Sequence, residues 1–375
     1  MNNQWGFSFK KTPSLNLETK FPSDSSCAGK KSFFRLLLSN MKILIATGIY
    51  PPDIGGPAQY AKNIETVWKN QGHTVKVLSF KFEKKLPAGI RHLWYAFRLL
   101  FQMTRSDMVI AMDTFSAGVP AVFVAKILHK KIIARTGGDF LWEAYVERTG
   151  DLTLLRNFYN TRMNKLSKKE RVIFRLTRYM LTNTDGIVFS TKWQRDIFIP
   201  AYGIDPKKTH IVENYYGNKE ESFEPLVKNF IAGARPLKWK NLDRVREVFS
   251  SADVKKANVI FEESGETFEK FMERISRCYA VILASLGDIS PNMILDAIRH
   301  NKPFILTKET GLYDRLKNIA IFVDPENTDD IKEKILFLAD EKNYRESVAK
   351  ISAFTFTHSW EEICDELIKI YKNVP

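Results

Sequence analysis

The sequence predicts an α/β protein built from two doubly wound, Rossmann-like domains. Its 375 residues exceed what a single hydrophobic core usually organises. In both halves, short apolar runs typical of buried strands alternate with stretches of helical periodicity, as in βαβ units. A third observation is a loop rich in glycine and proline between the first strand and the first helix.

The composition indicates a globular protein that prefers anionic partners. Hydrophobic residues make up 44% of the chain, aromatic residues 13%, and the formal net charge is +14. This charge suits phosphorylated ligands, anionic lipid or nucleic acid, but no nucleic-acid-binding signature is recognisable. Cys27, Cys278 and Cys364 form no disulfide or metal-site spacing, which favours a reducing cytoplasm. The sequence has no apolar run near the roughly 18–20 residues of a spanning helix and no cleavable signal.

Residues 1–40 differ from the rest of the chain. They are rich in Ser, Asn and Lys and lack sustained periodicity until residues 33–38. Met41 then opens the buried-strand pattern Lys42–Thr47. We therefore expect a loose extension over 1–40 and a functional start at Met41. A membrane-touching or partner-binding arm is the alternative.

The first βαβ unit carries the glycine-rich loop. Residues 48–58 hold three prolines and three glycines, so we expect neither helix nor strand there. A helix over 58–70 and a strand over 74–80 follow. Gly55 and Gly56 at the mouth of that helix would let a ligand approach the backbone closely. The loop is neither a G-x-G-x-x-G motif nor a P-loop, and a plain tight turn explains it equally well.

The first domain is predicted to cover residues 41–222. Residues 91–103 read as an aromatic amphipathic helix, and residues 156–178 are strongly basic with interleaved aromatics. That basic surface is expected either to lie against anionic lipid or to be a solvated helix face. Further strands are expected at 108–112, 131–134, 186–190 and 210–213.

The second domain is predicted to cover residues 223–353, after an acidic hinge at 220–225. The final segment, 354–375, contains an amphipathic helix, Trp360–Asn373, expected to cross back to the first domain. Within the second domain, strands are expected at 230–232, 258–261, 280–283, 303–307 and 319–323, and helices at 242–250, 266–277 and 329–340.

One strand-loop-helix stretch, residues 280–298, carries two acids. Ser290 is a plausible N-cap and Pro291 suits the first helical position. The free N–H groups of such a helix start favour a phosphate. Asp288 precedes the helix and Asp296 falls near its second turn. Ordinary solvated acids at a helix start are an equally good explanation of this stretch alone.

Several motifs, in this order, resemble the family 4 glycosyltransferases, which are retaining enzymes of the GT-B fold. The opening is MKILIATGIYPPDIGGPAQYA, and ARPLKWKNL matches the family's Arg-x4-Lys followed by Gly or Asn through Arg235 and Lys240. Asp288 and Asp296 form its acidic-x7-acidic pair, followed by AIRHNKPFILT and VDPENTDDI. The resemblance extends from Met41 to Tyr371.

The resemblance implies a nucleotide diphosphate sugar as co-substrate and no cofactor. Arg235 and Lys240 would neutralise the charge that grows on the leaving diphosphate. Asp288 would approach the donor sugar and Asp296 the nucleotide ribose. The helix start, residues Ser290, Pro291, Asn292 and Met293, would help to bind the donor, and Gly55 and Gly56 would border the phosphates and acceptor. No metal is expected, since the sequence has no Asp-x-Asp and no clustered His or Cys ligands.

Three departures from the family pattern bear on activity. Its acidic pair is most often Glu/Glu, so each acid here is shorter by about 1.5 Å, and misplacement on that scale can cost about 10²-fold in rate. Many members carry a His after the strand at 131–134, where this chain offers Arg135 or Asp139. The segment between Lys240 and Asp288 is also short.

The predicted function is transfer of a sugar, with retention, from a nucleotide donor to a lipid-linked or polysaccharide acceptor at the cytoplasmic face of the membrane. A catalytically degenerate relative that binds a nucleotide sugar or a partner protein is one alternative. Another GT-B enzyme, such as a nucleotide-sugar epimerase or a phosphorylase, is the other. The residues do not identify the sugar, the base or the acceptor.

Overall fold

The computed structural model describes residues 40–375, apart from residues 54, 81–82, 84–85, 88, 234–236 and 265–267. The predictions for the extension before Asn40, and the predicted phosphate ligand Arg235, therefore lie outside the described residues. Met41–Pro375 forms one compact unit. No described helix is long and apolar enough to cross a membrane.

The N-terminal domain is a parallel six-stranded sheet in the order β2-β1-β3-β4-β5-β6. Every residue of β3, β4 and β5 is buried, because helices cover both faces of a parallel sheet. The strands are β1 Lys42–Thr47, β2 Thr74–Ser79, β3 Met108–Ala111, β4 Ile133–Thr136, β5 Gly186–Phe189 and β6 Thr209–Ile211. The helices are α2 Gly56–Asn70, α3 Ile90–Met103, α4 Gly118–Ile127, α5 Phe140–Thr149, α6 Leu155–Thr161, α7 Lys168–Asn183 and α8 Lys192–Tyr202, with short 3₁₀ turns η2 Met163–Lys165 and η3 Pro206–Lys208.

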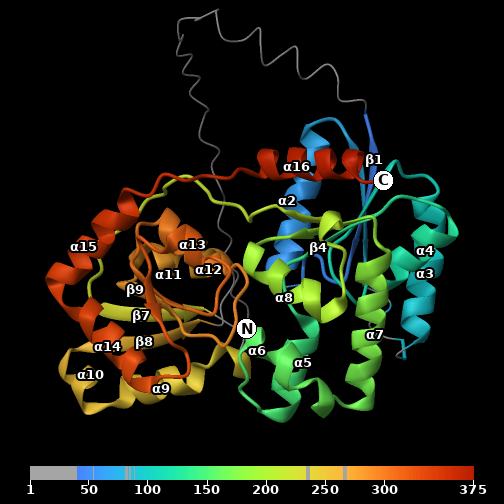
Figure 1. Cartoon of the computed structure of the whole chain (residues 1–375). Helices are drawn as coiled ribbons and strands as arrows, with labels where there is room; N and C mark the ends of the chain where they lie inside the picture. Colours follow the sequence, from blue (N-terminus) through green and yellow to red (C-terminus); the bar gives the residue numbers. More distant parts are fainter. Residues whose placement is uncertain are drawn as a thin grey trace, which may run out of the picture. The chain divides into compact units, whose positions relative to one another are not determined.

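The C-terminal domain is a parallel five-stranded sheet in the order β11-β10-β9-β7-β8 (Figure 1). Its first strand, β7, lies inside the sheet, so the chain winds outward from β7 in both directions. The strands are β7 Lys228–Gly233, β8 Val259–Ser264, β9 Ala280–Leu283, β10 Phe304–Thr307 and β11 Ile321–Val323. The helices are α9 Leu242–Ser250, α10 Ala252–Lys256, α11 Phe268–Arg277, α12 Asn292–Arg299, α13 Tyr313–Leu316, α14 Thr328–Ala339 and α15 Glu341–Ser352, with the 3₁₀ turn η4 Lys238–Lys240.

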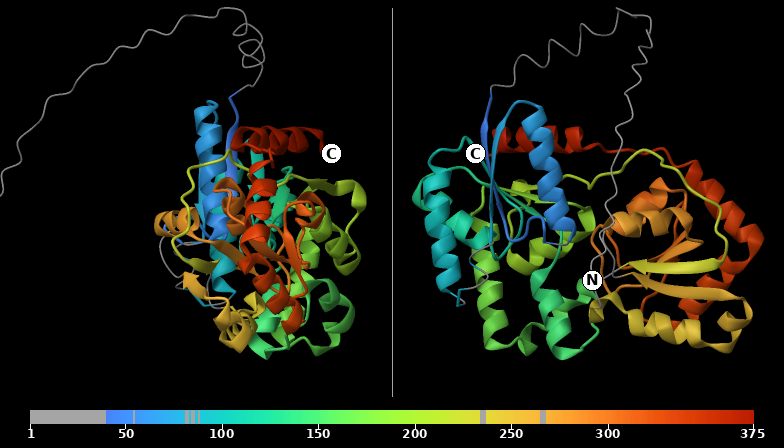
Figure 2. Two further views of the ribbon diagram at one scale, coloured as in Figure 1. Left: turned by 90° about the vertical axis from the view of Figure 1, so that its left-hand side faces the viewer. Right: turned by 180° about the vertical axis from the view of Figure 1, so that it is seen from behind.

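The last helix, α16 Trp360–Asn373, returns to the N-terminal domain, as Figures 1 and 2 show. Its start is fixed by a capping box in which Ser359 and Glu362 satisfy each other's backbone N–H groups. Ile363, Leu367 and the free thiol of Cys364 are buried in the core beneath β1 and α2. The predicted crossover helix is therefore confirmed.

Two local predictions about the first domain need correction. Helix α2 begins at Gly56 inside the loop expected to be irregular, because Pro57 occupies its first turn, where a proline costs no hydrogen bond. The basic stretch 156–178 is divided between α6, η2 and α7.

In the C-terminal domain, helix α15 was not among the predicted elements.

A hydrophobic cluster joins the two domains. We call it the interdomain cluster; it brings Trp142 and Leu155 of the N-terminal domain against Trp239 and Leu286 of the C-terminal domain. The rings of Trp142 and Trp239 lie 5.5 Å apart. A Cβ on Gly287 would come within 2.6 Å of the Leu155 Cβ, so the loop after β9 needs a glycine at this position.

Candidate functional site

The predicted donor residues gather at the carboxyl edge of the C-terminal sheet. Strands β7 and β9 are neighbours there, and the connections that leave them run to opposite sides. Such a switch point is where open α/β sheets bind ligands. The N–H of Gly233, at the end of β7, donates to the Met293 Sδ at 2.9 Å, so the start of α12 lies directly over β7.

Lys240 and Asp288, although 48 residues apart, form an ion pair at this edge. The Lys240 Nζ lies 2.7 Å from the Asp288 Oδ2, and the two side chains are only 16% and 12% exposed. The same ammonium lies 4.2 Å from the centre of the Trp239 ring. The Lys240 ammonium is largely buried and can exchange the Asp288 carboxylate for a phosphate oxygen. This suits a phosphate-binding site.

The loop that carries Asp288 is fixed on three sides by backbone hydrogen bonds. The N–H of Leu286 donates to the Trp239 carbonyl at 2.9 Å, and the Leu286 carbonyl accepts from the Leu155 N–H at 3.2 Å. The Asp288 N–H donates to the Glu309 carbonyl at 2.8 Å. The backbone at Asp288 is therefore held by contacts from both domains.

Asn241 explains why glycine or asparagine suits the position after Lys240. Its φ of 60° and ψ of 29° lie in the left-handed region, which these two residues adopt most easily. Its buried amide donates to the Ala284 carbonyl at 2.9 Å and the Pro325 carbonyl at 2.8 Å. One side chain thus ties the Lys240 turn to the loop after β9 and to the Val-Asp-Pro loop.

We expect Asn241→Ala to lower the free energy of unfolding by about 3–4 kcal/mol. Two buried hydrogen bonds are lost at about 1 kcal/mol each, and alanine is strained in the left-handed region by about 1–2 kcal/mol. Asn241→Gly removes the hydrogen bonds without the strain and should cost less. Urea unfolding of the three proteins measures the order, and a glycine variant less stable than the alanine variant would contradict this account.

The predicted cap of the donor-side helix is wrong. Pro291 is the N-cap, α12 begins at Asn292, and no side chain caps it. The Ser290 hydroxyl is buried without a hydrogen-bond partner among the described residues. Because proline has no side-chain acceptor, no side chain binds the first-turn N–H groups of α12. The Ile294 N–H donates to the Pro291 carbonyl at 3.1 Å, which leaves those of Asn292 and Met293 for solvent or a ligand.

Asp296 lies on α12 but does not join the Lys240–Asp288 pair. Its Oδ1 accepts from the Arg299 Nη1 at 2.8 Å, and Arg299 also pairs with Glu220. Burial raises the pKa of Asp296 to about 6, against the opposing effect of Arg299. The structure therefore places the two acids of the predicted pair in different ion pairs.

The raised pKa of Asp296 predicts a pH-dependent cost to folding. Because the folded protein holds this proton more tightly than the unfolded chain, stability falls as pH rises from about 4 to 6. Relative to wild type, Asp296→Asn should gain roughly 2–3 kcal/mol between pH 4 and pH 7.5, at 1.36 kcal/mol per pKa unit. Urea unfolding across this range tests it, and parallel pH profiles for the two proteins would refute it.

The Gly55-Gly56 loop lies opposite, against the start of α12. Gly55 has a φ of 150° and precedes α2 as its N-cap. A Cβ on Gly56 would sit 3.2 Å from the Asn292 Nδ2. The structure therefore brings the predicted glycine loop to the predicted donor-side helix.

Arg135, on β4 in the middle of the N-terminal sheet, is linked to the start of α12. Its Nη2 donates to the Asn214 Oδ1 at 2.5 Å, and its guanidinium lies 3.6 Å from the centre of the Tyr60 ring. The Asn214 amide in turn donates to the Ser290 carbonyl and the Asn292 Oδ1, each at 3.4 Å. Arg135 is 4% exposed, and no carboxylate pairs with it among the described residues.

Sequence reasoning missed Asn214 and Tyr60. Asn214 follows the edge strand β6 in a loop with no motif, and Tyr60 reads as one more apolar position on α2. Only the fold shows that both contact Arg135.

Asp139, the other candidate on the acceptor side, is engaged within its own domain. Its carboxylate accepts from the Trp142 N–H at 3.1 Å, as the N-cap of α5, and from the Tyr159 hydroxyl at 2.7 Å. It is 3% exposed, and burial raises its pKa to about 6. The carboxyl group is thus engaged by the helix cap and by Tyr159. A role for Asp139 toward the phosphates or the acceptor stays a prediction.

Among the described residues, no group of three or more His, Cys, Asp or Glu side chains could hold a metal ion.

The fold closely matches solved glycosyltransferase structures. HepE from Anabaena, in complex with UDP and glucose, has a TM-score of 0.62 and 12% identity, with 89% of this chain and 100% of HepE covered. Sucrose-phosphate synthase from Thermosynechococcus elongatus has a TM-score of 0.60 and 9% identity, with coverage of 89% and 98%. WaaG, a glycosyltransferase involved in lipopolysaccharide biosynthesis, has a TM-score of 0.58 and 12% identity, with coverage of 89% and 100%.

At these identities the likeness shows the fold, and the predicted GT-B architecture is confirmed. No protein-family model and no curated protein matches the sequence. The resemblance to family 4 therefore stays a prediction.

Proposed function

We propose that this chain is a glycosyltransferase that moves a sugar from a nucleotide diphosphate donor to a lipid-linked or polysaccharide acceptor. The observation that carries the proposal is the Lys240–Asp288 ion pair, 2.7 Å long and half-enclosed beside the uncapped start of α12. It sits at the switch point of the C-terminal sheet, opposite the Gly55-Gly56 loop.

In the proposed reaction, the bond between the sugar's anomeric carbon and the leaving diphosphate oxygen breaks as the acceptor hydroxyl oxygen bonds to that carbon. The proton of the acceptor hydroxyl passes to the leaving diphosphate. Lys240, with Arg235 beside it in sequence, would neutralise the negative charge that grows on the diphosphate. Asp288 would exchange its bond with Lys240 for hydroxyl groups of the donor sugar. The N–H groups at the start of α12 would complete the phosphate contacts.

Retention and independence of metal come from the family resemblance. HepE was solved in complex with UDP and glucose, and WaaG is involved in lipopolysaccharide biosynthesis, which favours a UDP donor and a glycan or lipid-linked acceptor. Arg135, buried without a carboxylate partner among the described residues, would suit a negatively charged group on either substrate.

A non-catalytic nucleotide-sugar-binding protein is the second candidate. It is favoured by the commitment of both short acids to ion pairs within the protein. This candidate predicts that donor binds but is neither hydrolysed nor transferred.

A panel of UDP-, GDP- and ADP-sugars separates these readings. The right donor at 100 times its dissociation constant should stabilise the protein by about 2.7 kcal/mol, seen as a shift of the melting curve. The transferase proposal also expects slow release of nucleoside diphosphate without acceptor. Binding without release favours the second candidate, a converted sugar without release favours an epimerase, and no shift with any donor defeats all three.

A further inference from the structure

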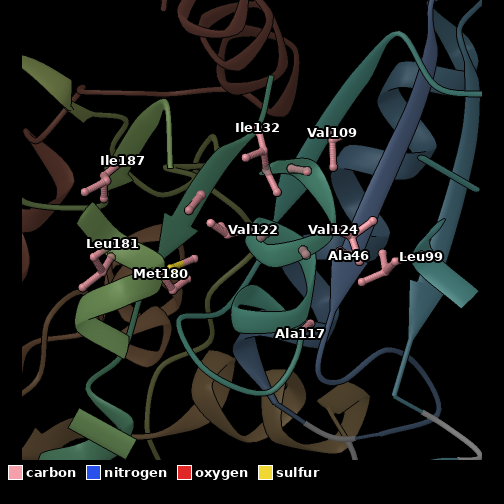
Figure 3. Close-up of a cluster of buried hydrophobic side chains, with 14 of the residues drawn as sticks. Ala46, Leu99, Val109, Ala117, Val122, Val124, Ile132, Met180, Leu181 and Ile187 are labelled. Atoms are coloured by element: carbon pink, nitrogen blue, oxygen red, sulfur yellow. The ribbon is translucent and has the colours of Figure 1, made fainter. Parts of the chain in front are cut away.

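Helix α3 is apolar on two opposite faces. Tyr95, Leu99 and Met103 are fully buried in the core of the N-terminal domain (Figure 3 shows Leu99 pointing into it). The opposite face consists of apolar side chains that fall within a sector of about 100° on the helix. These are Ile90, Leu93, Trp94, Phe97 and Phe101, exposed by 55%, 72%, 48%, 50% and 52%.

The exposed aromatic rings of α3 are ordered against one another. The ring centroids of Trp94 and Phe97 are 5.6 Å apart and stacked, and those of Phe97 and Phe101 are 4.9 Å apart in an edge contact. A row of three packed aromatic rings turned outward is unusual on a surface that meets only water.

The neighbouring helices continue this surface. Helices α3, α4 and α7 lie side by side over one face of the N-terminal sheet (Figures 1 and 2). Phe123 and Ile127 of α4 are 51% and 55% exposed. On α7, Val172, Leu176 and Tyr179 are 52%, 37% and 37% exposed at helical spacing. We call the exposed side chains of these three helices the basic-aromatic face.

The charge of this face has one sign. The three helices carry eight basic side chains and a single acid: Arg91, Arg98, Lys126, Lys168, Lys169, Arg171, Arg175 and Arg178 against Glu170. Arg98 pairs with the buried Glu83 and Lys126 pairs with Asp185 at 3.2 Å, which leaves six cations without an ion pair among the described residues. Glu170 is 4% exposed and is bound by Arg148 and by the Ser167 N–H, so it does not offset the surface charge.

The basic stretch 156–178 does not act as one surface. Arg156 pairs with Glu309 of the C-terminal domain at 2.5 Å, and Arg162 pairs with Asp151 at 2.7 Å. The five cations of α7 form no ion pair among the described residues. Of the stretch 156–178, only α7 therefore remains part of the surface expected to contact lipid. Helices α3 and α4 add to that surface.

We propose that the basic-aromatic face docks on the surface of an anionic lipid bilayer. Aromatic and aliphatic side chains would enter the boundary between headgroups and acyl chains, while Lys and Arg pair with lipid phosphates. A second copy of the chain is a poor occupant, because it would bring six unpaired cations against six. This inference goes beyond the proposed function and does not depend on it.

The test is co-sedimentation of the full chain with vesicles of phosphatidylcholine alone or with 30% phosphatidylglycerol. We expect binding to the anionic vesicles that weakens as salt is raised. Trp94→Gln/Phe97→Gln should lower the partition coefficient at least tenfold. The matched control is Phe337→Gln, which changes a 44% exposed phenylalanine on α14 of the other domain and should bind like wild type.

A second pair of variants tests the charges. Lys168→Gln/Lys169→Gln should weaken binding by about fivefold per charge, whereas Lys342→Gln/Lys350→Gln on α15 should not. Equal binding to both kinds of vesicle, or binding unchanged in Trp94→Gln/Phe97→Gln, overturns the proposal. So does a dimer in sedimentation velocity that this variant abolishes, since a second copy would then cover the face.

Discussion

Lys240→Met is expected to lower kcat/KM for release of nucleoside diphosphate by about 10³-fold. Methionine keeps the length of the side chain and its contact with the Trp239 ring but removes the positive charge that pairs with Asp288. The loss should appear in kcat more than in KM, because the charge on the diphosphate grows as the glycosidic bond breaks. Steady-state kinetics with the donor found by the panel measures it.

Lys238→Met is the matched control. Lys238 lies two residues away on the same 3₁₀ turn, but its ammonium is turned toward the Glu147 carbonyl at 2.9 Å. It should retain activity within about threefold, the range of ordinary surface substitutions. If Lys240→Met kept more than a tenth of wild-type activity, Lys240 would not stabilise the leaving group.

Asp288→Asn is expected to separate binding from turnover. In the free protein the carboxylate of Asp288 competes with a phosphate for Lys240, 2.7 Å away. Removing its charge should let UDP bind as tightly as in wild type or severalfold tighter. Turnover should nevertheless fall about 10²-fold, because the donor sugar loses a charged hydrogen-bond partner.

Calorimetric titration with UDP and kinetics on the same preparation measure the two effects. Asp314→Asn, an exposed acid on α13, should leave both unchanged. If Asp288→Asn weakened UDP and turnover equally, the carboxylate would act on nucleotide binding and not on the sugar.

The first and last residues of a helix or strand could be predicted where the local sequence determines them. Strand β9 and helix α16 have the predicted bounds, because a continuous buried run defines the strand and a capping box starts the helix. Helix α9 also has its predicted bounds, although no side chain caps it. Ser290 shows the limit of this reasoning. It is a favourable cap by residue type, yet α12 starts two residues later, since Pro291 keeps an extended backbone as the N-cap.

The candidate site depends on contacts that no local pattern encodes. The family resemblance assigned Lys240 and Asp288 to one site but predicted no ion pair between them. It also predicted neither the link from Arg135 to Asn214 nor that from Asp296 to Arg299. Asn214 lies 79 residues from Arg135 and 78 from Asn292. Such partners are chosen by the order of strands in a sheet, which short-range periodicity cannot specify.

The interdomain cluster limits how this protein can be recombined with others. Asp288 is positioned partly by Leu155 of the opposite domain, through the Leu286 carbonyl, and Trp239 packs on Trp142. A chimera whose C-terminal domain came from another glycosyltransferase would lose these contacts between the domains. The acid that corresponds to Asp288 would then be misplaced. A functional chimera therefore requires that four elements be exchanged together as a single unit: α5, α6, η4 and the loop after β9.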